Sequence, residues 1–144
     1  MPFAYLTRRV TFAAAHRYSR PEWSAERNYR VFGACANPNY HGHSYACEVT
    51  VRGEIDETTG FVVDLGALDA VLDEEVRRRF DHRNINLDVP EFADGRLVPS
   101  GENLARFIFD RVQSALAAAG ASAAAVTEVV VAEDATLRVS YRGD

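Results

Sequence analysis

Residues 41–54 decide the fold, and they read HGHSYACEVTVRGE. From His43 to Glu54 apolar and polar side chains alternate, which predicts a strand with one buried face. Side chains two residues apart point the same way in a strand, so His41 and His43 would present both imidazoles to that face. Gly42 between them carries no side chain and leaves room around the pair. This arrangement is typical of two ligands of one metal ion.

A second strand is predicted from Tyr5 to His16, because apolar and polar residues alternate there as well and the apolar parity ends at His16. A single histidine at a strand end is more often a hydrogen-bonded core or rim residue. Three of the four histidines in the chain share this placement, however: His16, His41 and His43. Catalytic Zn²⁺ takes three protein ligands and keeps a fourth position open, so the set predicts a catalytic zinc site.

The rest of the chain predicts two helices and two further strands. A helix is expected over about Leu65–Phe80, with Asp64 as its N-cap, because large apolar residues recur at spacings of three and four. Ser100 can cap a second helix with a similar apolar stripe. Strands over Val126–Glu133 and Ala135–Tyr141 complete the chain. This order predicts an α+β fold in which two helices cover one face of a four-stranded antiparallel sheet.

The composition is that of an ordinary globular domain. The 144 residues are 47% hydrophobic and 26% charged, with a formal net charge of -5. We therefore expect a single domain over residues 1–144 and exclude disorder, coiled coil and collagen. Arg77–Arg79 is the one basic run, so we expect no nucleic-acid partner. No stretch approaches the roughly 18 apolar residues that span a bilayer, and Met1–Arg9 has no signal-peptide core, so we expect no membrane association and a cytoplasmic protein.

The segment Arg17–Tyr40 is rich in Pro, Gly and Asn and has no sustained period, so we expect a long loop, which is usually functional. Cys35 lies in it, where a metal could lower its pKa from the reference of roughly 8.5 and make it a base. As a fourth zinc ligand Cys35 would instead close the site, which is typical of structural zinc. Cys47 has the apolar parity of its strand and is expected to be a separate, buried core thiol.

Two further features could carry chemistry. Asp81 and His82 are adjacent, and such a pair suits orienting and relaying a proton, although it also occurs at solvated helix ends. Glu133 ends an otherwise apolar strand, where a carboxylate can guard a sheet edge or accept N–H donors from a heterocycle. P-loop, GxGxxG, HExxH and GxSxG motifs are absent from the sequence, which argues against the common nucleotide, protease and hydrolase sites.

Several motifs follow one another along the chain. They are FAAAH at Phe12–His16, FGACANPNYHGHSY at Phe32–Tyr45, VRGEID at Val51–Asp56, DHRN at Asp81–Asn84, Glu102–Asn103, and Glu133. In this order the chain resembles the family of 6-pyruvoyl-tetrahydropterin synthases and 6-carboxy-tetrahydropterin synthases. The resemblance implies the tunnelling (T-) fold, in which the sheets of a homohexamer, a dimer of trimers, close into barrels and each pocket lies at a subunit interface.

The resemblance also implies roles for particular residues. It assigns zinc binding to His16, His41 and His43, catalysis to Cys35, Asp81 and His82, and substrate binding to Ser100, Glu102 and Glu133. In this scheme the cysteine is the base, the Asp–His pair assists proton transfer, and the glutamate late in the strand anchors the pterin ring.

The implied enzyme is a zinc-dependent carbon–oxygen lyase of tetrahydrobiopterin biosynthesis. It would convert 7,8-dihydroneopterin triphosphate to 6-pyruvoyl-tetrahydropterin and eliminate triphosphate. The near alternative is the carboxy-forming reaction that feeds queuosine synthesis, but the gap from Cys35 to His41 resembles the pyruvoyl-forming branch. The rival from another class is a non-catalytic zinc or pterin-binding module in which Cys35 closes the coordination sphere.

The chain departs from the family pattern at three positions. Gly101 stands where a hydroxyl residue is frequent, Asp134 follows Glu133 where Thr is common, and Ala34 stands where Lys often precedes the cysteine. Contacts to the triphosphate would therefore have to come from elsewhere. Candidates in the long loop are Arg17, Arg27 and Arg30.

Overall fold

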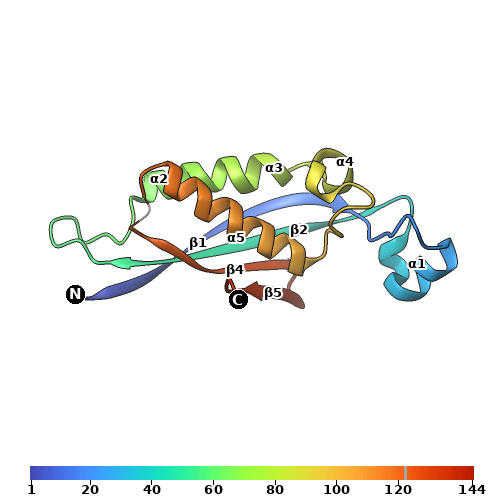
Figure 1. Ribbon diagram of the computed structural model, residues 1–144, viewed down its shortest axis with the longest axis horizontal. Coiled ribbons are helices and arrows are strands. Elements are labelled where there is room, and N and C mark those ends of the chain that lie inside the picture. Colours follow the sequence, from blue (N-terminus) through green and yellow to red (C-terminus); the bar gives the residue numbers. More distant parts are fainter. Residues whose placement is uncertain (122) are drawn as a thin grey trace.

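The computed structural model describes residues 1–121 and 123–144. In these residues one sheet is covered on one face by helices, so the molecule has two layers (Figure 1). The strands are β1 (Phe3–His16), β2 (His41–Glu54), β3 (Arg83–Asn84), β4 (Ala125–Asp134) and β5 (Leu137–Tyr141). Their order across the sheet is β3-β1-β2-β4-β5. An α+β fold is therefore confirmed.

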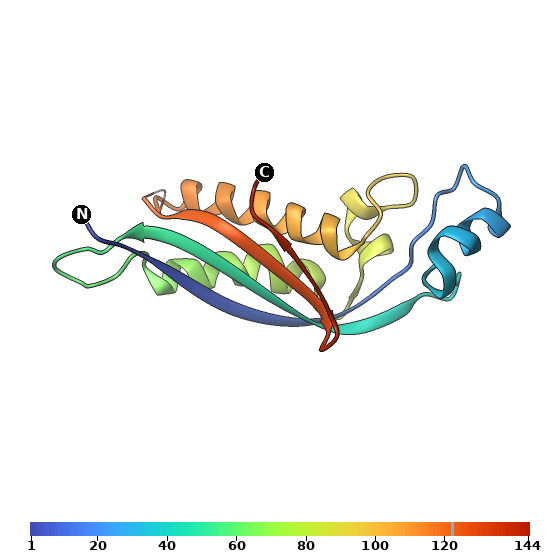
Figure 2. The same cartoon turned by 90° about the horizontal axis from the view of Figure 1, so that it is seen from below.

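The long pair β1 and β2 forms the centre of the sheet. The two strands are antiparallel and in register from Phe3 opposite Glu54 to His16 opposite His41, without a bulge. A strand of 14 residues spans about 45 Å at roughly 3.3 Å per residue, which explains the elongated sheet in Figure 2. Both predicted strands are confirmed, and their last residues meet at one end of the sheet.

The prediction of a four-stranded antiparallel sheet missed one strand. β4 pairs antiparallel with β2, and β5 pairs antiparallel with β4, as expected. A fifth strand, β3, lies parallel to β1 at Ala14–Ala15, so the sheet is mixed. Because β3 has two residues, it carries no alternation that a sequence pattern could reveal. These two residues form a strand because they pair with the edge of β1.

The helical layer follows the prediction in its main lines. The expected helix over Leu65–Phe80 is α2 (Leu65–Leu72), a π-helical turn at Asp73–Arg77, and α3 (Arg78–Phe80). Asp64 caps α2 by accepting a hydrogen bond from the backbone N–H of Ala67 at 3.1 Å. The second expected helix is α5 (Gly101–Ala118), and Ser100 caps it through the N–H of Asn103 at 3.2 Å.

The expectation of a loop over Arg17–Tyr40 was wrong in part. The segment contains α1 (Ala25–Phe32), capped by Ser24, and a 3₁₀ turn at Gly33–Ala36. Only Asn28 of α1 is buried, so the helix has no buried apolar stripe from which it could be predicted. α1 lies at the end of the sheet, apart from the layer of α2, α3 and α5 (Figures 1 and 2). Two further short helical segments, α4 (Ile85–Asp88) and a 3₁₀ turn at Pro90–Phe92, follow β3.

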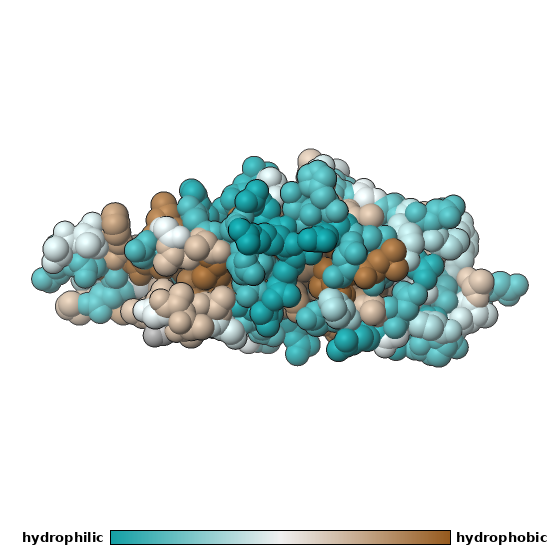
Figure 3. Space-filling view, turned by 90° about the horizontal axis from the view of Figure 1, so that it is seen from above, coloured by the Kyte–Doolittle hydropathy of each residue, from teal (hydrophilic) through white to brown (hydrophobic). Residues whose placement is uncertain are grey.

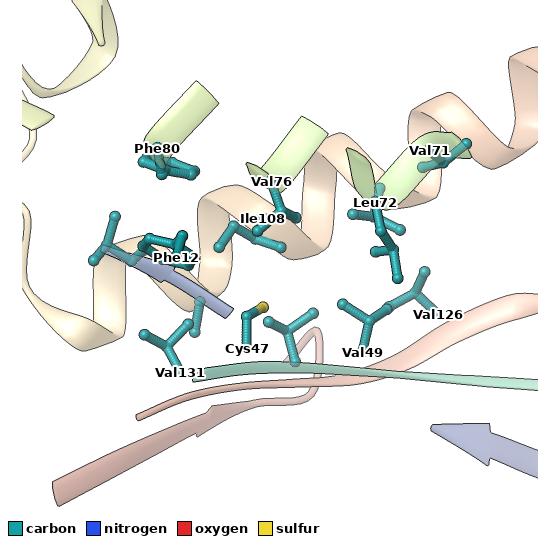
Figure 4. Packing of buried hydrophobic residues seen from close by; sticks show 14 of the residues in the cluster. Phe12, Cys47, Val49, Val71, Leu72, Val76, Phe80, Ile108, Val126 and Val131 are labelled. Carbon is teal, nitrogen blue, oxygen red and sulfur yellow. The ribbon is translucent and has the colours of Figure 1, made fainter. Parts of the chain in front are cut away.

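The hydrophobic core fills the space between the sheet and the helices (Figure 4). Phe12 of β1 stacks on Phe80 with ring centroids 5.4 Å apart, and Val76 and Ile108 come from the two helices. Cys47 is completely buried among them, as its parity predicted, and both cysteines are free thiols. The face of β1 and β2 that carries this core is the face on which the histidines lie farther along the strands.

The outer surface of the helices is mostly hydrophilic across its middle (Figure 3). Arg77 and Arg78 both pair with Asp73 there, and Arg78 also reaches Glu74 at 3.4 Å. The basic run of the sequence is therefore partly neutralised by neighbouring carboxylates. None of the helices in residues 1–121 and 123–144 combines the length and apolar character needed to cross a membrane.

Gly101 has a packing role that explains its departure from the family pattern. It is buried at the first turn of α5, and a Cβ atom there would lie 2.9 Å from Cγ2 of Val139 in β5. A side chain at this position would therefore force Val139 or the start of α5 to shift. The small residue lets the start of α5 approach the sheet.

We predict that Gly101→Thr lowers the free energy of unfolding by about 2 kcal/mol, because overpacking forces Val139 or the helix to move. Chemical denaturation of Gly101→Thr, Val139→Ala and the double variant measures this. In the Val139→Ala background the cost of the threonine should fall to less than about half. Equal costs in both backgrounds would contradict the assigned contact.

Candidate metal centre and active site

The end of the β1–β2 pair brings His16, His41 and His43 together. His16 faces His41 across the two strands, and His43 follows two residues later on the same side. The ring centroids of His16 lie 4.6 Å from His41 and 5.1 Å from His43, and one ligand nitrogen of each residue lies within 4.8 Å of the others. Three imidazoles at this spacing can hold one metal ion, at about 2.0–2.1 Å per ligand in the case of zinc, after small side-chain rotations.

His16 is held in an orientation that suits a metal ligand. Its Nδ1 lies 2.9 Å from the carbonyl oxygen of Pro99 and 3.1 Å from the hydroxyl of Tyr45. With the Nδ1 proton donated to that carbonyl, Nε2 is left to bind a metal, as is usual for ligating histidines. Burial, followed by the neighbouring His41, lowers the pKa of His16 to about 4, so the ring stays neutral as ligation requires.

The other two histidines have ring nitrogens without partners in the described part of the chain. Nδ1 of His41 and Nε2 of His43 are both buried and lack a hydrogen bond. Leaving such an atom buried and unpaired costs about 1–3 kcal/mol, and a metal ion would remove that cost for both rings at once. These nitrogens therefore fit a metal bound by the three histidines.

Glu133 lies beside the histidines, at the end of β4. Its Oε2 is 3.7 Å from Nε2 of His43, too long for a hydrogen bond, and its Oε1 accepts one from the hydroxyl of Tyr18 at 2.9 Å. The side chain is 11% exposed, so the carboxylate is largely buried. The predicted anchor for a heterocycle is thus placed next to the candidate metal centre.

Tyr18 is a site residue that the sequence analysis missed. Burial, followed by the charge of Glu133, raises the pKa of its phenol, so it remains a hydrogen-bond donor. Its ring meets that of His16 edge to face with centroids 4.9 Å apart. The sequence held one signal for it: Tyr18 lies two residues after His16 and so would point to the same face of an extended chain. Because β1 ends at His16, however, Tyr18 lies beyond the predicted strand.

Cys35 lies in the 3₁₀ turn after α1 and is half-buried. Its carbonyl oxygen accepts a hydrogen bond from the backbone N–H of Tyr18 at 2.8 Å, which ties the turn to the segment after β1. Burial, followed by the negative charge of Glu133, raises the pKa of the thiol. The chain by itself therefore keeps Cys35 protonated, and a cation or substrate would have to favour the thiolate.

Asp81 and His82 form the predicted pair, with Oδ2 and Nδ1 3.0 Å apart. Asp81 also accepts the backbone N–H of Ala13 at 2.9 Å, and this bond, followed by His82, lowers the pKa of the carboxyl. His82 is 84% exposed and lies beyond the β1 edge of the sheet. Among the described contacts, none joins this pair to Cys35.

Ser100 and Glu102 lie at the start of α5, where Pro99 reaches His16. The hydroxyl of Ser100 is used by the helix cap, whereas Glu102 is exposed and close enough to Tyr18 for its charge to raise the phenol pKa. The start of α5 therefore borders the histidine cluster.

The other departures and the loop arginines have local contacts. Asp134 accepts hydrogen bonds from Thr136 and so supports the turn between β4 and β5, and Ala34 is an exposed residue of the 3₁₀ turn. Arg17 pairs with Asp94 at 2.8 Å, and the Arg27 guanidinium lies 4.1 Å from the centre of the Trp23 ring. Arg30 is exposed. Arg17 and Arg27 are thus already engaged within the chain.

Comparison with known proteins identifies the family. A family model described as 6-pyruvoyl tetrahydropterin synthase matches residues 5–144. The chain belongs to this family. It is accordingly an enzyme, a carbon–oxygen lyase like 6-pyruvoyl-tetrahydropterin synthase, and the family acts on a pterin substrate.

Individual relatives agree with this assignment. The human 6-pyruvoyl tetrahydrobiopterin synthase is 44% identical over 113 residues, which cover 78% of this chain and 77% of the human protein. The Drosophila melanogaster enzyme of the same name is 41% identical over 143 residues, which cover 99% of this chain and 81% of the Drosophila protein. The solved structure of Caenorhabditis elegans 6-pyruvoyl tetrahydropterin synthase has a TM-score of 0.89 at 33% identity and covers 100% of this chain and 98% of its own.

We predict that His41→Ala weakens metal binding by at least about 100-fold, because it removes one ligand of three and leaves an open coordination position. Competition between a chelator and the protein for Zn²⁺ measures the affinity. His82→Ala is the matched control and should bind the metal like the unaltered protein, since His82 lies outside the cluster. Equal affinities for the two variants would exclude this cluster as the metal centre.

Proposed function

We propose that the chain is a Zn²⁺-dependent lyase that converts 7,8-dihydroneopterin triphosphate to 6-pyruvoyl-tetrahydropterin and eliminates triphosphate in tetrahydrobiopterin biosynthesis. The observation that carries the proposal is the cluster of three histidines with a buried carboxylate, Glu133, beside it. Membership of the family supports a pterin as the substrate. Cys35 does not share the set of converging ligand atoms, which supports an open, catalytic coordination sphere rather than a closed, structural one.

In the proposed reaction His16, His41 and His43 hold the zinc, and Glu133 accepts N–H donors of the pterin ring. Zinc, when bound, supplies a Lewis acid that acidifies the C–H and O–H groups of the substrate side chain. Cys35 accepts and returns the proton, because its side chain is half-buried and its turn is tied to Tyr18, whereas Cys47 is completely buried in the core. The redox change is internal to the substrate, so no external reductant is needed.

The carboxy-forming reaction of queuosine synthesis remains the alternative for the same site. It would use the same ligands and the same base and would differ in which bond of the side chain breaks. We favour the pyruvoyl product because relatives named 6-pyruvoyl tetrahydrobiopterin synthase cover most of the chain. The other alternative is a non-catalytic zinc or pterin-binding module, and an activity assay distinguishes it from an enzyme.

We further propose that the chain assembles into a homohexamer of two trimers and that the pair Asp81–His82 serves Cys35 of a neighbouring subunit. Within one subunit the pair lies beyond the β1 edge of the sheet, and His82 is 84% exposed. Most of β1 is also an edge, because β3 covers it only at Ala14–Ala15. Such an edge favours pairing with another chain, in agreement with sheets that close into a barrel.

The enzyme assay makes a direct prediction. Zinc-loaded protein incubated with dihydroneopterin triphosphate should release triphosphate and form the pyruvoyl-pterin, as identified by mass spectrometry. Cys35→Ala should keep its zinc and lose about 10²–10⁴-fold in kcat, because the base is gone. A carboxy-pterin with acetaldehyde would move the protein to the queuosine branch, and loss of zinc in Cys35→Ala would support the closed site.

Mixing two inactive variants tests the shared site. Co-expressed Cys35→Ala and His82→Ala subunits should recover up to about a quarter of the unaltered activity, since one site in four then joins an intact cysteine to an intact histidine of another subunit. Each variant alone stays inactive. Absence of recovery in mixed hexamers would mean that each subunit completes its own site.

A further inference from the structure

Tyr18 connects the three parts of the candidate site. Its backbone N–H donates to the carbonyl oxygen of Cys35 at 2.8 Å, and its hydroxyl donates to Oε1 of Glu133 at 2.9 Å. Its ring lies against His16, with centroids 4.9 Å apart, and near His41 at 6.5 Å. One residue thus touches the thiol-bearing turn, the carboxylate and two of the candidate metal ligands.

The tyrosine hydroxyl occupies only part of the hydrogen-bonding capacity of Glu133. An ionised carboxylate offers about four lone-pair sites on two oxygens, and the hydroxyl takes one of them. Among the described residues Oε2 accepts no hydrogen bond, and Nε2 of His43 lies 3.7 Å from it. A heterocycle that presents two adjacent N–H donors can therefore bind to the remaining sites while Tyr18 fixes the direction in which the carboxylate points.

We propose that Tyr18 is a positioning residue that holds the Glu133 carboxylate in the orientation in which it receives the N–H donors of the pterin. This inference rests on the proposed function of the same site. The hydroxyl is the atom that acts, since the ring has its own packing partners, with Phe32 at 5.9 Å and 72° in addition to His16. A phenylalanine would keep this packing and the backbone bond to Cys35 and would lose only the bond to Glu133.

Binding of neopterin, a fluorescent pterin, to zinc-loaded protein in the Cys35→Ala background measures this role without turnover. Tyr18→Phe should raise the Kd about tenfold, because it removes one charge-assisted hydrogen bond that orders the carboxylate. Zinc content should stay unchanged, and the melting temperature should fall by only a few degrees, because one hydrogen bond to a charged group is lost. In the active protein the loss in kcat/KM should appear in KM, with kcat within about twofold, because the hydroxyl acts through Glu133 on binding.

A double-mutant cycle separates positioning from a general change of the pocket. After Glu133→Ala the Tyr18→Phe substitution should cost nothing more, because the group that it positions is gone. Tyr29→Phe, at an exposed tyrosine on α1, is the matched control and should bind neopterin normally. An unchanged Kd for Tyr18→Phe, or the same loss with and without Glu133, would overturn this inference alone. Failure of the Cys35→Ala protein itself to bind neopterin would overturn the proposed function together with it.

Discussion

The antiparallel pairing of β1 with β2 is the constraint on which the rest of the structure depends. Because the two strands stay in register over their whole length, the alternation that buries Phe12 and Cys47 also decides where the last side chains point. A slip of one residue would turn the core outward and move His16 away from His41. The hydrophobic effect that holds the sheet against the helices thus also sets the geometry of the histidine cluster.

The same burial gives the cluster its chemical character. His16 is fully buried and donates to the carbonyl oxygen of Pro99, so its imidazole is neutral and oriented. His41 and His43 each keep one buried nitrogen that has no hydrogen-bond partner among the residues that the structure describes. The cost of the unsatisfied nitrogens becomes part of the affinity for a metal, since ligation removes it.

Sequence alternation predicted the elements that have a regular apolar face, and it failed where tertiary contacts decide. β1, β2 and the helices capped by Asp64 and Ser100 follow from period and caps, as does the convergence of the three histidines. α1 could not be predicted in this way, because its one buried residue, Asn28, is polar. The sequence also could not show that no contact among the described residues joins Asp81 or His82 to Cys35, since a motif carries no information about contacts with residues far away in the chain.

The segment that leaves β1 is held by polar contacts, which also attach the turn that carries Cys35 to the end of the sheet. Arg17 is held through both backbone groups by the side chain of Asn86, and Tyr18 is held by Cys35 and Glu133. Farther along, the side-chain amide of Asn28 accepts a hydrogen bond from the backbone N–H of Arg20 and donates one to its carbonyl oxygen, which fixes α1 to the same segment. These polar contacts act together with the packing of Phe32 against Tyr18 and Trp23. Because hydrogen bonds are directional, these contacts fix the turn that carries Cys35 relative to the end of the sheet.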